Sequence, residues 1–224
     1  MKANFHRTNY FLILSLGAML IGFAPIFVKW SLLSSSAIAF YRMSLTIPFL
    51  FGLNYLLNGR LKFRVKNKRT IIYAAFASLA FTTDLTLWHY SMGITSVSNA
   101  TIIVNSAPIF VAILSFIFFK EKLSKGFVVS FLVTYLGIVG LIYYSNNYIN
   151  GKILGDILCM IAAFFYAVYL LVIARLGKEN SLNIIFYTTL FCCLFSIIPM
   201  IIEGGDIFPS SKFEWINLLL LAVL

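Results

Sequence analysis

Long apolar runs separated by short polar breaks dominate the pattern of residues along this chain. A helix that crosses a membrane needs about 20 predominantly apolar residues. Runs of this kind occupy residues 10–32, 37–57, 71–90, 97–119, 127–144, 154–173 and 182–202. An eighth run begins near Ile216 and stops with the chain at Leu224, so it covers roughly 13 Å of a hydrocarbon core about 30 Å thick. The pattern predicts seven full spans and a partial eighth. We expect a fragment of a longer protein rather than a re-entrant last segment.

The composition agrees with a chain whose solvent is lipid. Of its 224 residues, 61% are apolar and only 11% are charged, and the mean hydropathy is +0.96. A typical soluble domain is about 45–50% apolar and about 25% charged, and a soluble chain of this size cannot hide so much apolar surface. We therefore predict an all-α integral membrane protein, a multi-spanning helix bundle.

The basic residues are distributed unevenly between the predicted loops. Thirteen of the 17 Lys and Arg residues fall on one predicted side of the membrane. They are Lys2, Arg7, Arg60, Lys62, Arg64, Lys66, Lys68, Arg69, Lys120, Lys122, Lys125, Arg175 and Lys178. The other side carries only Lys152 and Lys212. Because cytoplasmic loops are enriched in Lys and Arg, we predict a multi-pass protein of the inner, cytoplasmic membrane with a cytoplasmic N-terminus. The same rule accounts for the net charge of +10 without nucleic acid as a partner.

A repeat of hydropathy relates the two ends of the chain. A shift of 145 residues aligns residues 10–57 with residues 155–202 without a gap, and the span lengths and the short polar break match. Such repeats are typical of secondary transporters, whose solute sites lie near the membrane midplane between the repeats. Five helices per repeat, an odd number, give the two repeats opposite topologies. We predict two five-helix inverted repeats, the first over residues 1–146 and an incomplete second over residues 147–224.

Several motifs carry a resemblance to a known family. They are residues 84–90 (DLTLWHY), 95–101 (TSVSNAT), 105–111 (NSAPIFV) and 120–123 (KEKL), with Gly22, Lys29, Arg42 and Gly155-Asp156. Along almost its whole length the chain resembles the EamA-type branch of the drug/metabolite transporter superfamily. The resemblance implies a secondary transporter of ten helices that moves a small organic metabolite or drug by alternating access, with proton coupling as an option. This chain departs from that pattern because it ends within its eighth helix.

That departure leaves a second hypothesis open, a non-transporting remnant or an assembly partner of a membrane complex. An enzyme is the third class, but His6 and His89 are the only histidines, and no HExxH, CxxC or P-loop motif is present. We predict no enzyme activity, no cofactor and no metal site. The expected partners are a small-molecule solute and membrane lipid, and a homodimer stays open.

Three ionisable residues lie inside the predicted spans. Lys29, Arg42 and Asp84 fall roughly 5, 8 and 9 Å below the outer ends of their runs. Such residues are costly in lipid and mark solute or ion pathways. At this similar depth they can converge on one pocket, where Asp84 relays a proton or cation and Arg42 or Lys29 holds an anionic group. Alternatively, an ion pair between Arg42 and Asp84 locks two helices and Lys29 extends to the interface.

The fourth apolar run carries a polar stripe. Ser98, Thr101, Asn105 and Pro108 follow one another at spacings of three and four residues, which places them along one helical face. Because Pro108 cannot donate a backbone hydrogen bond to Val104, we expect a kink there. The stripe faces either a solute cavity or another helix.

The outer end of the third run carries Trp88, His89 and Tyr90. An aromatic belt is the simplest interpretation of Trp88 and Tyr90. His89 either titrates near neutral pH or is solvated. The predicted solute-binding residues are therefore Lys29, Arg42, Asp84, His89, Thr101 and Asn105.

The remaining polar residues are given structural roles. We expect solvated loop positions for four carboxylates, which are Asp156, Glu203, Asp206 and Glu214. We expect the three cysteines, Cys159, Cys192 and Cys193, to be buried as small apolar side chains.

Overall fold

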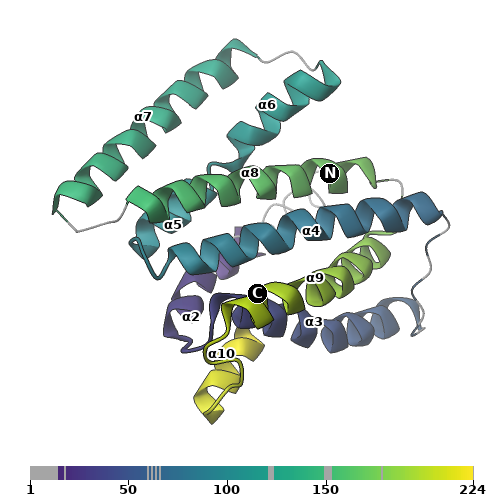
Figure 1. The fold of residues 1–224 in the computed structure, drawn as a ribbon. Coiled ribbons are helices and arrows are strands. Elements are labelled where there is room, and N and C mark those ends of the chain that lie inside the picture. The colour runs from purple at the N-terminus through teal and green to yellow at the C-terminus, as the bar shows by residue number, and fades with distance from the viewer. Residues whose placement is uncertain are drawn as a thin grey trace, which may run out of the picture.

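The computed structural model describes residues 15–17, 19–59, 61, 63, 65, 67–120, 124–148, 153–177 and 179–223. Within these residues every regular element is a helix (Figure 1). The helices are α2 (Ala24–Trp30), α3 (Ser35–Asn58), α4 (Lys68–Ser91), α5 (Val97–Val104), α6 (Ala107–Phe119), α7 (Lys125–Tyr148), α8 (Ile153–Arg175), α9 (Ser181–Glu203) and α10 (Lys212–Val223). The predicted all-α class is thereby confirmed.

Five stretches of the described chain are long and apolar enough to cross a membrane. They are α3, α4, α5 together with α6, α8 and α9. The first predicted run lies partly outside the described residues. Helix α7 follows the fifth run for 24 residues, and its part Lys125–Gly140 is an apolar helix shorter than a full span. The predicted count of seven full spans therefore stays a prediction.

The polar breaks between the apolar runs supply the residues that begin and end the helices. Asn67 accepts a hydrogen bond from the Arg69 N–H at the start of α4, and Asn180 accepts one from the Leu182 N–H at the start of α9. Such caps satisfy backbone donors that the first helical turn leaves unpaired. Helix α10 begins at Lys212, before the predicted start at Ile216, because the Ser211 hydroxyl accepts a hydrogen bond from the Glu214 N–H.

Two of the apolar runs are broken helices. The fourth run divides into α5 and α6 at Asn105 and Ser106, next to Pro108 in the first turn of α6. Pro108 lacks the N–H that would bond to the Val104 carbonyl, so the predicted kink at Pro108 is confirmed. In the first run, a turn at Gly22 and Phe23 precedes α2.

Helix α4 lies at the centre of the bundle and packs against α3, α8 and α9 (Figure 1). Its contact faces are made of small residues. Ala77 of α4 and Ala162, Ala163 and Ala167 of α8 are fully buried. The Ser78 hydroxyl also donates a hydrogen bond of 2.9 Å to the Thr188 carbonyl of α9. Small side chains let membrane helices approach closely, which explains why these helices form the core.

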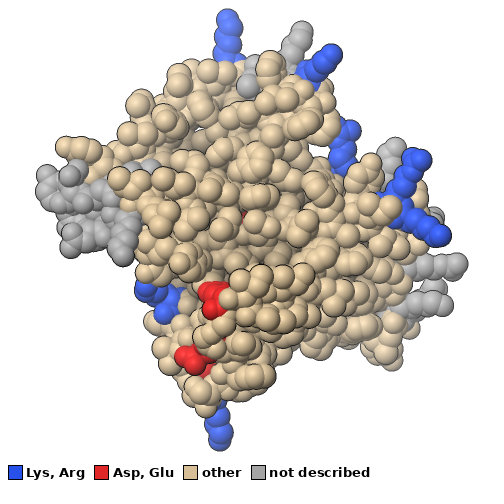
Figure 2. All heavy atoms as spheres, viewed as in Figure 1, with Lys and Arg blue, Asp and Glu red and all other residues tan. Residues whose placement is uncertain are grey.

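The charged side chains gather at the two ends of the bundle. Figure 2 shows Lys and Arg side chains at the end where α4 begins and α8 ends and beside α6 and α7, whereas acidic side chains lie near α9 and α10 at the other end, together with further basic groups. The predicted orientation also depends on Lys2, Arg7, Arg60, Lys62, Arg64, Lys66, Lys122, Lys152 and Lys178, which lie outside the described residues. Which end faces the cytoplasm stays a prediction.

Candidate functional site

A cavity of about 330 Å³ lies between α2, α3, α4, α5 and α8, and we call it the central cavity. Both broken helices contribute to its wall. Gly22 and Pro25 line it at the break before α2, and Val104 and Asn105 line it at the break between α5 and α6. Its volume falls at the lower end of the range that pockets for small organic molecules occupy.

Two side chains of opposite charge type share the central cavity. Arg42 of α3 and Asp84 of α4 both line it, and a guanidinium and a carboxylate at such close quarters attract each other. Only 4% of Asp84 is exposed, and its Oδ1 atom has no hydrogen-bond partner within the described part of the chain. A buried carboxylate oxygen without a partner is costly. The arrangement therefore leaves acceptor capacity for a proton or for a bound molecule.

Polar and aromatic side chains complete the wall. Thr101 of α5 and Asn105, which follows the last residue of α5, lie on the wall, in agreement with one of the two expectations for the polar stripe. The Asn105 amide donates to the Thr101 carbonyl at 2.7 Å. Phe81, Trp88 and Tyr166 add aromatic surface. Trp88 was expected in an aromatic belt at the interface, but its Nε1 is buried and its ring faces this cavity. The cavity can thus hold a molecule with an apolar body and charged or polar groups.

Lys29 and His89 line a separate cavity of about 180 Å³. We call it the outer cavity because it lies at the end of the bundle that the sequence predicts to face outward. The Lys29 ammonium donates to the Met92 carbonyl at 3.0 Å. His89 is 3% exposed, and its Nδ1 lies 3.2 Å from the Ser35 carbonyl oxygen. Because a carbonyl only accepts, this contact assigns the proton of the neutral ring to Nδ1. Nε2 is then a buried acceptor, and no described group bonds to it.

The six predicted site residues therefore divide into two groups. Arg42, Asp84, Thr101 and Asn105 line the central cavity, whereas Lys29 and His89 line the outer cavity. Lys29 does not join Arg42 and Asp84 in one pocket, because its side chain turns to the end of α4. The similar depth of the three residues in their predicted spans did not indicate the direction of each side chain. The roles of all six in binding stay predictions.

The carboxylates expected in solvated loops include two that are buried. Asp156 is 1% exposed and accepts a hydrogen bond of 2.7 Å from the Thr95 hydroxyl. Glu214 is 3% exposed and accepts one of 3.1 Å from the Leu32 N–H. The exposed Glu203 accepts from the Ser35 and Ser36 N–H groups at the start of α3. One signal for the burial of Asp156 was its position after Gly155 in a motif of the family.

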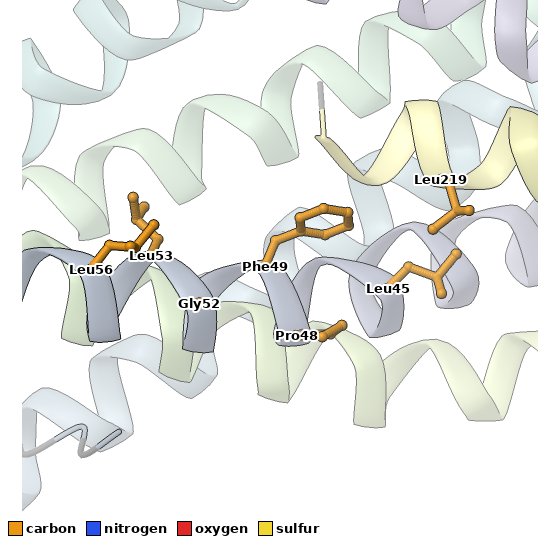
Figure 3. A pocket seen from close by; sticks show the side chains of 7 residues that line it. All are labelled: Leu45, Pro48, Phe49, Gly52, Leu53, Leu56 and Leu219. Carbon is orange, nitrogen blue, oxygen red and sulfur yellow. The ribbon is translucent and has the colours of Figure 1, made fainter. Parts of the chain in front are cut away.

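A larger apolar groove of about 600 Å³ runs along the surface of α3 (Figure 3). Leu45, Pro48, Phe49, Gly52, Leu53 and Leu56 line it from α3, and Leu219 lines it from α10. All of these residues are apolar, so the groove has no side-chain group that would orient a polar solute. The smaller central cavity, with charges of both signs, is the better candidate site.

Residues 8–143 match the family described as the EamA-like transporter family. The chain is also similar to an uncharacterized transporter in the sor 3′ region of Acidianus ambivalens, with 26% identity over 137 residues. The matched segment is 61% of this chain and 53% of that protein, so the chain spans about half the length of this relative. Members of the matched family are transporters rather than enzymes. The family match covers more than half of the chain and includes four helices that line the central cavity, so the chain belongs to the EamA-like transporter family.

Proposed function

We propose that the protein is a secondary transporter that moves a small organic solute across the cytoplasmic membrane by alternating access. The observation that carries this proposal is the pair of opposite charges, Arg42 and Asp84, in a cavity between two broken helices. In secondary transporters, discontinuous helices near the membrane midplane form the solute site. Ionisable residues inside a membrane segment also mark solute and ion pathways.

The lining of the central cavity suggests a role for each group. Arg42 holds an anionic group of the solute, because a guanidinium offers several donors in one plane. Thr101 and Asn105 hydrogen-bond its polar atoms. The aromatic side chains of Phe81, Trp88 and Tyr166 contact its apolar part. Asp84 binds the coupling proton. Lys29 and His89, which line the outer cavity, are assigned to contact the solute before it enters the central cavity from the outer side.

The helix contacts support the two inverted repeats, residues 1–146 and 147–224. The 145-residue shift pairs α2 with α8, α3 with α9 and α4 with α10, and the bounds of α3 and α9 then agree to within one residue. The contact of α4 with α8 corresponds to that of α10 with α2, and both are present. The contact of α4 with α9 corresponds to that of α10 with α3, and both are present too. A two-fold relation between the halves produces this exchange.

The test is transport by the purified chain in liposomes. A panel of labelled amino acids, organic acids and amines is screened for uptake with and without a pH gradient. For a solute that is taken up, Arg42→Gln should raise KM at least about tenfold, the effect of losing a hydrogen bond to a charged group. Lys212→Gln, an exposed basic residue at the start of α10, is the matched control and should match wild type. Equal KM values for the two variants would place the solute elsewhere.

A further inference from the structure

The turn between α4 and α5 is bound to the start of α8. The Thr95 hydroxyl donates to Asp156 Oδ1 at 2.7 Å, and the Asn99 amide donates to the same oxygen at 3.3 Å. Thr95 and Asn99 are 7% and 2% exposed, so these bonds lie inside the protein. We call this group of Thr95, Asn99, Gly155 and Asp156 the α8 clamp. It joins the two proposed repeats, because its first two residues precede residue 147 and the other two follow it.

Gly155 lets the two segments of the clamp touch. A Cβ atom at Gly155 would lie 2.8 Å from the Thr95 Cβ and 3.0 Å from the Thr95 backbone nitrogen. Real Cβ atoms do not approach other atoms this closely, so any other residue would push the α4–α5 turn away from α8. One turn along α8, the Cys159 thiol lies 2.9 Å from the Ser91 hydroxyl, and Cys159 is fully buried. The contact thus continues along the same face of α8.

The charge of Asp156 has no cationic partner among the described residues. Its Oδ1 accepts from two neutral side chains, and its Oδ2 is buried without a hydrogen-bond partner. Burial of a carboxylate is costly unless hydrogen bonds compensate for the lost water. The stability of the buried Asp156 carboxylate therefore depends on the hydrogen bonds that Thr95 and Asn99 donate. Separation of the α4–α5 turn from α8 would remove both bonds.

Asn99 connects the clamp to the central cavity. It lies in the first turn of α5, the helix that presents Thr101 and Asn105 to the cavity. Helix α5 has only eight residues and is broken from α6 at Asn105, so α6 does not extend it as a continuous helix. The α4–α5 turn holds its first residue, and α8 is the helix that it contacts most, with smaller contacts to α2, α4 and α7.

We propose that Asp156 is a positioning residue: through Thr95 and Asn99 it fixes α5 against α8, so that Thr101 and Asn105 stay on the wall of the solute cavity. The part of this proposal that concerns solute rests on the transport function proposed above. The part that concerns the position of α5 does not, and it is measured without any solute.

The native thiol of Cys159 reports whether the clamp is closed. In a chain with Cys192→Ser and Cys193→Ser, labelling of Cys159 by N-ethylmaleimide requires the α4–α5 turn to move from α8. Asp156→Asn keeps an acceptor oxygen but removes its charge, which weakens both hydrogen bonds of the clamp, whereas Thr95→Val removes one of them. Each variant should raise the labelling rate about tenfold or more. Thr95→Ser keeps the hydroxyl and should restore most of the slow labelling. Gly155→Ala should raise the labelling rate as much as Thr95→Val does. It replaces Asp156→Asn in the experiment if Asp156→Asn does not fold.

Asp206→Asn is the matched control, because the Asp206 side chain is exposed and, among the described residues, its backbone carbonyl rather than its carboxylate accepts a bond, from the Ser34 N–H. It removes the same charge without touching the clamp and should leave the labelling rate unchanged. A rate for Asp156→Asn within about twofold of that of Asp206→Asn would overturn the proposal.

A second probe tests the position of α5. In a chain whose three native cysteines are serines, Asn105→Cys places a thiol on the cavity wall. Its reaction rate with a charged methanethiosulfonate reagent should change severalfold when Asp156→Asn is added, and Asp206→Asn should leave it unchanged. An unchanged rate with Asp156→Asn would mean that the clamp does not position α5. If no solute is transported by any variant, the transport function fails while both labelling results still decide the role of Asp156.

Discussion

A carboxylate inside a membrane helix needs hydrogen-bond donors, a cation or a proton, because its charge is costly to bury alone. Asp156 and Asp84 meet this need differently. Asp156 accepts bonds from two neutral side chains, Thr95 and Asn99. Asp84 faces a cavity that also contains Arg42, and in the described chain its Oδ1 has no partner. The difference agrees with the clamp proposed for Asp156 and with the proposed binding of the coupling proton by Asp84.

At Asp84 the exchange of a proton can be separated from the movement of solute. We predict that Asp84→Asn reduces solute accumulation driven by a pH gradient to background, because an amide has the size of the carboxyl but does not bind the coupling proton. Exchange of solute down its own gradient should continue. The measurement is uptake by proteoliposomes with the gradient imposed and, separately, counterflow without it. Asp206→Asn is the control, and accumulation that survives in Asp84→Asn would remove Asp84 from the coupling step.

The helices themselves were largely predictable from the sequence, because apolar runs and single residues determine them. The break before α6 follows from Pro108 alone, since proline lacks a backbone donor. The direction of a side chain was not predictable in the same way. Lys29 and Arg42 have similar depth, yet Lys29 bonds to the Met92 carbonyl and Arg42 faces the central cavity. That difference depends on which helices are neighbours, which hydropathy does not specify.

We expect the helix break at Pro108 to lower the stability of the protein and to increase its transport rate. Pro108→Ala restores a donor for the Val104 carbonyl and should stabilise the protein by about 1 kcal/mol, the net value of one hydrogen bond. The straightened helix should move Asn105 on the cavity wall and slow transport severalfold. Thermal unfolding in detergent and initial transport rates measure the two effects.

Pro199→Ala is the control for this change, because Pro199 lies inside α9 and does not line the central cavity. It should stabilise the protein in the same way without slowing transport. Equal loss of transport in both variants would mean that general rigidity, rather than the break at the cavity, limits the rate.

The interface between α4 and α8 should not tolerate larger side chains. Ala163 is fully buried on α8, so Ala163→Leu forces extra volume into a close helix contact. We expect a loss of about 1–3 kcal/mol in the free energy of unfolding, measured by thermal unfolding in detergent. Ile161→Leu is the control, because Ile161 is 41% exposed and its substitution should change stability by less than about 0.5 kcal/mol. A stable Ala163→Leu variant would show that α4 and α8 can separate at little cost.

At the scale of the whole molecule, contacts between distant segments decide which polar residues are buried. Asp156 is 61 residues from Thr95, and Glu214 is 182 residues from Leu32. The sequence placed both acids in predicted loops or at a helix start, where solvation is the usual outcome. Their burial results from packing of the second half of the chain on the first. The hydropathy pattern along the sequence does not specify which distant segments pack together.

The orientation of the molecule, in contrast, is predicted by the sequence and can be tested directly. Basic side chains gather where α4 begins and α8 ends, and acidic side chains lie at the opposite end (Figure 2). If the positive-inside rule sets the orientation, a topology reporter inserted after Lys120 should signal the cytoplasmic side, and one inserted after Asp206 the outer side. Replacement of the six basic residues between positions 60 and 69 by Gln should weaken this preference and yield mixed signals. Unchanged signals would mean that the other basic loops suffice, whereas reversed signals in the native chain would place the outer cavity of Lys29 and His89 on the cytoplasmic side.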